Sequence, residues 1–258
     1  MDVHWSREFE SNPGTVTIIK DCVGRYFVTL CLDEKVNILP KTGEAVGIDL
    51  GINRLATLSN GEHIANPRHL GFKLRKLARL QRILARRKKG SGRWNSQRIK
   101  VARCHAHISD SRKDYLDKLT TNLIRRFDVL AIEDLGVRNM MSNGKLARCI
   151  GDAGFGMCRR MLEYKADWCG KEVKLVDRFF PSSKRCNCCG FISEKLPLNV
   201  REWDCPECKA HHDRDENAAK NILGAGHAPT VRGCQVRRTK VSTSVCNDRR
   251  TVNQPALS

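Results

Sequence analysis

The sequence is short of long apolar runs. None of its 258 residues falls in a stretch that approaches the roughly 18 apolar residues of a membrane span. The first residues also have no apolar signal-peptide core, and no internal repeat is evident. These absences predict a cytoplasmic protein without a membrane partner. In that compartment the thirteen cysteines are expected to be metal ligands and buried thiols rather than disulfides.

Acidic residues are absent from one long stretch. No Asp or Glu occurs between Glu62 and Asp110, in a chain with 47 Lys and Arg, 28 Asp and Glu and a formal net charge of +19. Without acids to form i,i+4 pairs, the cations of a helix here would repel one another, and contact with phosphates would relieve that repulsion. A solvated helix face is the alternative. We predict nucleic-acid contacts from Arg75, Lys76, Arg79, Arg82, Arg86, Arg87, Lys88 and Lys89.

The spacing of apolar residues predicts a mixed α/β chain. β-branched and aromatic runs predict a β-hairpin over 15–32 and further strands over 45–49, 55–58, 63–65, 129–133 and 172–176. Leucines at helical spacing from Leu70 to Leu84, and a second pattern from Ile108 to Phe127, predict an antiparallel helical hairpin broken at 89–92. Further helices are expected around 161–168 and over 214–223.

Four cysteines form two C-x2-C pairs. Fifteen residues separate Cys186 and Cys189 from Cys205 and Cys208. This spacing is typical of a structural zinc ribbon, in which four thiolates close a tetrahedral site, and it disfavours a chance group of buried thiols.

Three other residues near the cluster are alternative ligands. Cys188 could replace one neighbour, although Gly190 directly after Cys189 favours Cys189 as the ligand. His211 and His212 are weaker alternatives.

Three acidic residues stand where a fold would hold them rigidly. Asp49 and Glu133 each end an apolar run that predicts a buried strand, and Asp215 opens a helix after the cysteine cluster. Carboxylates brought together would repel one another unless divalent cations lay between them. Two Mg²⁺ ions in such a site would ready a water for attack on phosphorus and stabilise the departing 3′ oxygen. One carboxylate at a strand end is usually a cap or surface group, so the prediction rests on all three.

Two neighbouring acids are rivals for these roles. Asp134 follows Glu133 directly, so on an extended strand it faces the other way. Asp213 precedes the helix and is placed to cap its N-terminus.

Five motifs occur in a characteristic order: G-I-D-L-G-I-N-R-L-A-T-L-S-N-G, A-I-E-D-L-G-V-R-N-M, S-S-K-R-C-N-C-C-G, W-D-C-P-E-C and H-D-R-D-E-N-A-A-K-N-I-L. In combination, over residues 15–225, they resemble the TnpB (OrfB) proteins of bacterial insertion sequences, which are relatives of type V CRISPR effectors and are often described as transposases. The resemblance implies an α/β, RNase H-like (RuvC) mixed sheet with flanking helices, an inserted helical hairpin and a zinc ribbon. It also implies DNA cleavage directed by a guide RNA from the transposon end. By the same resemblance, Asp49, Glu133 and Asp215 bind the catalytic magnesium, and Cys186, Cys189, Cys205 and Cys208 bind zinc.

The resemblance also divides the chain into parts. Residues 1–40 would be the remnant of a β-barrel, 41–180 a nuclease core that includes the basic helical hairpin 68–127, 181–212 the zinc ribbon and 213–225 the last helix. Beyond the resemblance, residues 226–258 contain Pro, Ser, Thr and scattered Arg without periodicity, which predicts a disordered tail. Family members usually have a β-barrel and a helical recognition lobe before the nuclease domain, so the chain resembles a truncated copy. A second departure is Lys209, which follows Cys208 where the family commonly has Gly.

Three functions fit these observations. The first is a metal-dependent, RNA-guided DNA endonuclease associated with transposition and DNA recombination. The second is a catalytically silent copy that only binds nucleic acid, for example as a repressor. The third is a transposase that joins strands itself. The three intact acids favour the first, the absent lobe favours the second, and the ribbon's position argues against the third. The sequence does not indicate an oligomeric state.

Overall fold

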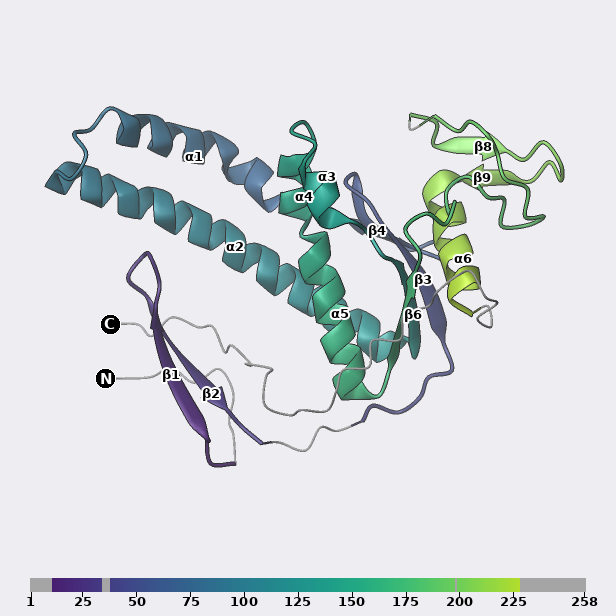
Figure 1. Ribbon diagram of the computed structural model, residues 1–258, viewed down its shortest axis with the longest axis horizontal. Coiled ribbons are helices and arrows are strands. Elements are labelled where there is room, and N and C mark those ends of the chain that lie inside the picture. Colours follow the sequence, from purple (N-terminus) through teal and green to yellow (C-terminus); the bar gives the residue numbers. More distant parts are fainter. Residues whose placement is uncertain (1–10, 34–37, 198, 228–258) are drawn as a thin grey trace. The chain divides into compact units, whose positions relative to one another are not determined.

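The computed structural model describes residues 11–33, 38–197 and 199–227 (Figure 1). They form two compact units, one from the residues before 37 together with Leu70–Ser111, the other from Asn37–His69 and the chain from Arg112 onward. The predicted disorder of the tail falls outside the described residues from 228 on, so it stays a prediction. No described helix combines enough length with enough apolar residues to span a membrane.

The first unit contains the predicted β-hairpin and most of the helical pair. Strands β1 (Thr15–Lys20) and β2 (Tyr26–Cys31) pair antiparallel. Helix α1 (His69–Ala85) and the first part of α2 (Gly92–Arg126) pack through a small apolar cluster of Leu77, Cys104 and Ile108. The two helices and the break between them agree with the leucine spacing.

The second unit is built on a five-stranded mixed sheet. Its strands are β3 (Ala45–Leu50), β4 (Arg54–Leu58), β5 (His63–Ala65), β6 (Val129–Glu133) and β7 (Glu172–Val176), in the order β5-β4-β3-β6-β7. The first three form an antiparallel meander, and β6 and β7 run parallel to β3. This is the mixed RNase H-like sheet that the resemblance implies.

The two faces of the sheet carry different helices. Val46, Ile48, Leu130 and Ile132 belong to the main core, which includes residues of α5 (Phe155–Cys169) and the second part of α2. The opposite face is covered by α6 (Arg214–His227), and Figure 1 shows α5 and α6 on either side of the sheet. Helix α6 crosses β3 so closely that a Cβ on Gly47 would lie 2.0 Å from the carbonyl oxygen of Ala219.

Some short elements were not anticipated. These are α3 (Val137–Met141), α4 (Ala147–Ala153), β8 (Glu202–Asp204) and β9 (His211–Asp213). The predicted end of the last helix was wrong, because α6 continues to His227 and includes the first two residues assigned to the tail. Glycine has a low helix propensity, but Gly226 lies where a Cβ would be 2.7 Å from Cβ of Ala131, so close packing favours glycine there.

Candidate metal and nucleic-acid site

Asp49 and Glu133 occupy equivalent positions on neighbouring parallel strands. Ile48 pairs with Ile132, so the residues that follow lie side by side. Because side chains alternate along a strand, both acids point to the face opposite the core residues Ile48 and Ile132. They therefore emerge together at the carboxyl ends of β3 and β6, on the face that α6 covers.

Asp215 is held by the capped start of α6. The Oδ1 atom of Asp213 accepts hydrogen bonds from the backbone N–H groups of Asp215 (2.9 Å) and Glu216 (3.0 Å). This confirms the predicted capping role of Asp213. The Asp215 carboxylate also accepts a hydrogen bond from the guanidinium group of Arg201, at 3.1 Å.

The three predicted acids line one cavity of about 480 Å³. Its other walls come from the end of β3, the loop after β7 and the start of α6: Leu50, Gly51, Phe179, Phe180, Pro181, Ser182, Ser183, Lys184 and Arg214. The fold thus brings together three carboxyl groups that are far apart in the sequence.

Two of these acids are perturbed electrostatically. Burial, helped by Asp215 and Glu133, raises the pKa of Asp49 to about 8. Burial also raises the pKa of Glu133 to about 7, with further contributions from Asp134 and Asp177. Near neutral pH the cavity therefore holds protons that a bound cation would displace, as expected where carboxylates converge on a cation site.

Asp134 does not line the cavity. Its carboxylate pairs with Arg159 and, at 2.6 Å, with Arg178. Although burial opposes the shift, hydrogen bonds from these two guanidinium groups lower the pKa of Asp134. This neighbour of Glu133 is therefore engaged elsewhere, as the alternation of the strand predicts.

Three buried polar residues of α6 were missed by the sequence analysis. Arg214 donates a hydrogen bond to the carbonyl of Pro197 at 2.7 Å. Asn217 and Asn221 donate side-chain hydrogen bonds to carbonyl groups of residues 182–185. Their spacing in D-R-D-E-N-A-A-K-N places all three on one helix face among Ala and Ile. This spacing could have predicted that the three side chains lie together on the packed face of the helix. They attach the helix that carries Asp215 to the loop that lines the cavity.

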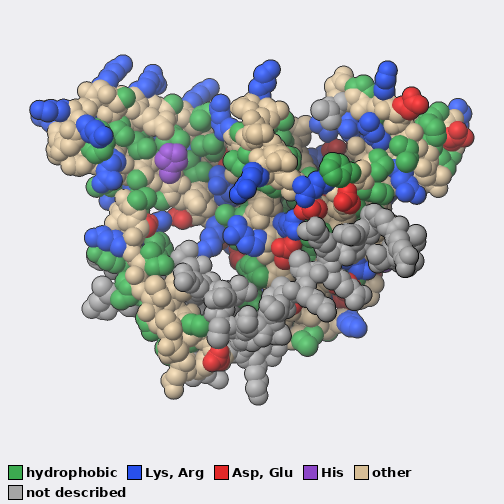
Figure 2. Space-filling view, in the orientation of Figure 1, with side chains coloured by type: hydrophobic (Ala, Val, Ile, Leu, Met, Phe, Trp, Pro, Cys, Tyr) green, Lys and Arg blue, Asp and Glu red, His purple; other side chains and the backbone are tan. Residues whose placement is uncertain are grey.

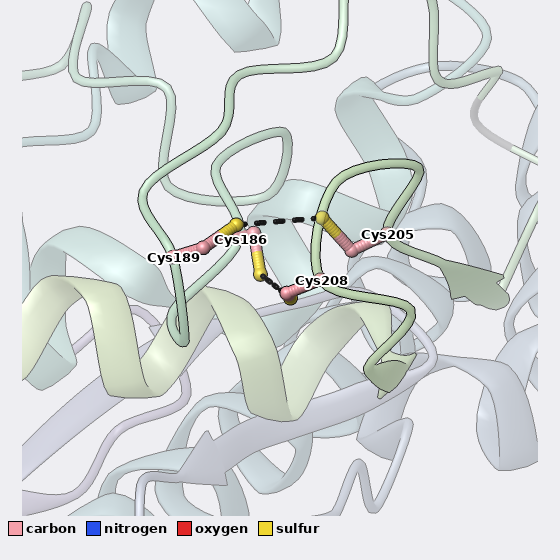
Figure 3. Close-up of side chains that lie close together, drawn as sticks. All are labelled: Cys186, Cys189, Cys205 and Cys208. Carbon is pink, nitrogen blue, oxygen red and sulfur yellow. Dashed lines mark hydrogen bonds between the residues drawn. The ribbon is translucent and has the colours of Figure 1, made fainter.

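The four predicted cysteines converge on one point (Figure 3). The Sγ atoms of Cys186 and Cys208 lie 3.6 Å apart, and those of Cys189 and Cys205 lie 3.5 Å apart. Four thiolates around a tetrahedral zinc, with bonds of about 2.3 Å, would be separated by about 3.8 Å. The donor set and its spacing therefore fit a tetrahedrally bound metal ion.

The two cysteine loops have similar turns with different residues. Gly190 donates its backbone N–H to the Cys186 carbonyl at 3.0 Å, and Lys209 donates to the Cys205 carbonyl at 2.9 Å. Both turn residues have left-handed backbones, with φ of 82° at Gly190 and 61° at Lys209. Lysine thus keeps the turn that the family's usual glycine would form, although a side chain there is strained.

Two of the alternative ligands, Cys188 and His212, lie close to the cluster. Nε2 of the buried His212 is 3.0 Å from Sγ of Cys186, and Cys186, Cys188 and His212 form a second group that could hold a metal ion. His211 instead pairs with Asp204 through Nδ1, at 2.8 Å. Burial opposes ionisation of Cys186, but backbone N–H groups and His212 lower the pKa of its thiol to about 5.

The predicted basic segment presents its charges to solvent. Side chains of Arg75, Lys76, Arg79, Arg82, Arg86, Lys88 and Lys89 are exposed, and Arg87 is half-buried. Arg87 donates a hydrogen bond to the carbonyl of Arg93, across the break between α1 and α2. Figure 2 shows Lys and Arg side chains along this helical hairpin. Exposed cations in such a row are suited to phosphate contacts.

Comparison with known proteins identifies the family. A family model described as "Probable transposase" (OrfB of IS605) matches residues 29–144, and one described as "Cas12f1-like, TNB domain" matches residues 155–222. The chain belongs to the TnpB (OrfB) family. A relative in Streptomyces pristinaespiralis, named "Putative RNA-guided DNA endonuclease", is 49% identical over 245 residues, which cover 94% of this chain and 61% of the relative. The protein InsQ of Escherichia coli (strain K12), with the same description, is 33% identical over 248 residues, covering 90% of this chain and 61% of InsQ.

Solved structures share the fold of this TnpB-family chain. A CRISPR-Cas12f ternary complex matches 81% of this chain and 44% of the Cas12f chain, with a TM-score of 0.54 and 19% identity. A Cas12f1–sgRNA–target DNA complex matches 72% of this chain and 50% of its own, with a TM-score of 0.51 and 18% identity. The TnpB-family chain spans about 61% of the length of the two relatives named above.

Proposed function

We propose that this TnpB-family chain is a metal-dependent DNA endonuclease guided by RNA. The observation that carries the proposal is the convergence of Asp49, Glu133 and Asp215 in one cavity. The names of the relatives support the substrate and the guide, because both relatives described above are called "Putative RNA-guided DNA endonuclease".

Magnesium is the cation that this donor set suits best. Mg²⁺ prefers carboxylate oxygens and keeps several waters, so three carboxylates are sufficient for two ions. When bound, such ions supply an activated water and charge neutralisation at the leaving 3′ oxygen. In the proposed reaction Asp49 and Glu133 act as fixed ligands on the sheet, and Asp215 completes the site from α6. Lys184, whose ammonium group donates to the Glu194 carbonyl at 3.2 Å, also lines the cavity and would attract the phosphate backbone.

The cysteine cluster has a different proposed role. Four thiolates select zinc, and a site closed by four protein ligands has no open position for a substrate. We therefore infer that Cys186, Cys189, Cys205 and Cys208 bind a structural zinc ion, which folds the segment between β7 and α6.

Replacing Asp49 tests the nuclease proposal. Asp49→Ala should reduce Mg²⁺-dependent cleavage by about a thousandfold or more. It removes a ligand of the metal ions, which would stabilise the charge of the transition state by several kcal/mol. DNA binding should be nearly unchanged. Cleavage and filter-binding assays on labelled DNA, with the chain expressed together with its guide RNA, would measure both.

A matched control is Glu44→Gln, at an exposed acid just before the other end of β3. It should leave cleavage intact. Equal loss of binding and cleavage in Asp49→Ala would mean that Asp49 is structural. Binding without any cleavage by the wild-type chain would instead favour the catalytically silent alternative.

The basic segment is proposed to bind nucleic-acid phosphates. Reversing Arg79, Arg82 and Arg86 to Glu should weaken binding and flatten its dependence on salt, because each lost phosphate contact removes about 0.9 from the slope of log K against log salt. Titrations at four or more salt concentrations would measure the slope. An unchanged slope would exclude this segment as a phosphate contact.

A further inference from the structure

One large aromatic side chain of the cavity wall is left exposed. Phe179 lines the cavity beside Asp49 and Glu133, yet its relative exposure is 87%. A phenylalanine in water forgoes the stabilisation that burial of its ring would give. An exposed ring beside converging carboxyl groups is suited to contact a ligand with a planar apolar surface.

The exposure of Phe179 does not come from a loose backbone. Its N–H group donates a hydrogen bond to Oδ1 of Asp177 at 2.8 Å, and the next N–H, of Phe180, donates to the Asp177 carbonyl at 3.0 Å. The side chain of Phe180 packs against the apolar cluster of Val176 and Ile222. The two adjacent phenylalanines thus differ in role, since Phe180 anchors the turn and Phe179 is presented to solvent.

The far end of this loop is also attached. The side-chain amide of Asn221 donates to the Ser182 carbonyl at 2.9 Å, and the Pro181 carbonyl accepts N–H groups of Lys184 (3.1 Å) and Arg185 (3.0 Å). Asn221 belongs to α6, the helix that carries Asp215. The Phe179 backbone is therefore tied to the same framework that positions the carboxyl groups.

The cavity wall combines three kinds of group that suit a nucleic-acid strand. The carboxyl groups suit cations, Lys184 suits a phosphate, and the Phe179 ring suits the face of a base. Bases in a duplex already stack on one another, so an exposed ring of this kind can stack only on a base that has left its stack. Stacking accepts any of the four bases, because each has a π-face, and it would hold a strand without reading its sequence.

We propose that Phe179 stacks on an unpaired nucleobase of the DNA strand beside the phosphate to be cleaved. This role rests on the proposed nuclease function and names the side chain that would hold one nucleotide of the strand at the cavity. Phe179 is a strand-positioning residue in this proposal, because its ring has no group that reacts.

Binding and photochemical crosslinking test the proposal independently of turnover. The full chain with its guide RNA is mixed with single-stranded DNA that carries 5-iododeoxyuridine at successive positions, with Ca²⁺ in place of Mg²⁺. Irradiation should crosslink one position to the peptide that contains Phe179. Phe179→Ala should abolish that crosslink and weaken strand binding by about tenfold, within the range of known base–aromatic contacts, whereas Phe179→Trp should keep both.

A matched control is Phe72→Ala. Phe72 is 84% exposed but belongs to the other unit and does not line the cavity, so its removal should leave the crosslink to the Phe179 peptide unchanged. A strand with one abasic site at the crosslinked position should bind the wild-type chain more weakly, while Phe179→Ala should not distinguish it from the intact strand.

The outcomes separate the two proposals. Wild-type cleavage in Mg²⁺, with unchanged binding and crosslinking in Phe179→Ala, would overturn the stacking role and leave the nuclease proposal standing. Failure of the wild-type chain to bind or cleave DNA would overturn the nuclease proposal and the stacking role with it.

Discussion

The carboxylate site and the cysteine cluster each bring together side chains that repel one another when ionised. The two sites differ in how much apolar core supports them. Asp49 and Glu133 stand at the ends of strands whose neighbouring residues, such as Ile48 and Ile132, are 1% and 0% exposed, so a core positions them without any metal. Among the described residues, the apolar cluster around the cysteines has only Trp203 as a buried side chain besides Cys186 and Cys205. In the first region the fold creates the site. In the second, we propose that a bound metal is needed for the cysteine loops to fold.

This difference predicts which region a metal would stabilise. Binding free energy becomes folding free energy where a segment folds only when the metal is bound. Loss of Mg²⁺ should therefore abolish cleavage at the carboxylate site without unfolding the sheet. Loss of zinc should unfold the cysteine loops.

The largest expected effect tests the cysteine side of the comparison. Cys205→Ser replaces a fully buried thiol and should abolish zinc binding, which contributes on the order of 10 kcal/mol to folding in small zinc domains. Residues 186–213 should then exchange their amide protons rapidly, while β3 and β6 stay protected. Zinc analysis and hydrogen exchange would measure this.

Cys188→Ser provides the matched control, because Cys188 is an exposed thiol in the same loop. It should leave zinc content unchanged. Retention of zinc in Cys205→Ser with its loss in Cys188→Ser would contradict the assigned ligand set, and would favour the group of Cys186, Cys188 and His212.

A smaller effect is expected on the carboxylate side, as a dependence of stability on pH. The pKa values of Asp49 (about 8) and Glu133 (about 7) lie above the value of about 4 for unfolded carboxyl groups. Between these pKa values the folded chain therefore binds more protons than the unfolded chain. The resulting stabilisation is fully present below pH 4, and it is lost as the pH rises through the pKa values of the folded chain. Without added Mg²⁺, the wild-type chain should become less stable between pH 5 and pH 8.

Asp49→Asn should reduce this slope, because the amide resembles the protonated acid and does not ionise. Urea titrations at several pH values would compare the two chains, and added Mg²⁺ should restore wild-type stability at pH 8. Identical slopes for wild type and Asp49→Asn would show that Asp49 ionises normally and that the cavity is not a strained set of carboxyl groups.

The smallest expected effect concerns the two cysteine turns. Lys209→Gly should stabilise the zinc-bound chain by about 1 kcal/mol, because a left-handed backbone is strained in lysine and free in glycine. Gly190→Ala should destabilise it by a similar amount. Thermal melts with zinc present would measure both, and a loss of stability in Lys209→Gly would mean that the lysine side chain makes a compensating contact.

The sequence was informative where local pattern and tertiary position agree. The apolar runs before Asp49 and Glu133 predicted central strands, and the cysteine spacing predicted the cluster. The helical spacing of Arg214, Asn217 and Asn221 indicated a shared helix face. The hydrogen-bond partners of Arg214 and the exposure of Phe179 were not predictable from local pattern, because they depend on how the loop after β7 lies against α6. Strands β8 and β9 were also missed, since each is only a three-residue strand within the cysteine loops.

The insertion of the cysteine loops between β7 and α6 has a consequence for the helix that carries Asp215. Residues 177–213 connect the sheet to α6. When the loops are folded, this segment keeps the start of α6 close to the sheet. The effective concentration of α6 at the sheet is then high. When the loops unfold, the segment becomes a long flexible chain, and the effective concentration falls at least as steeply as the −3/2 power of its length. Zinc would thus control how often the third acid is present in the cavity, without contacting the cavity.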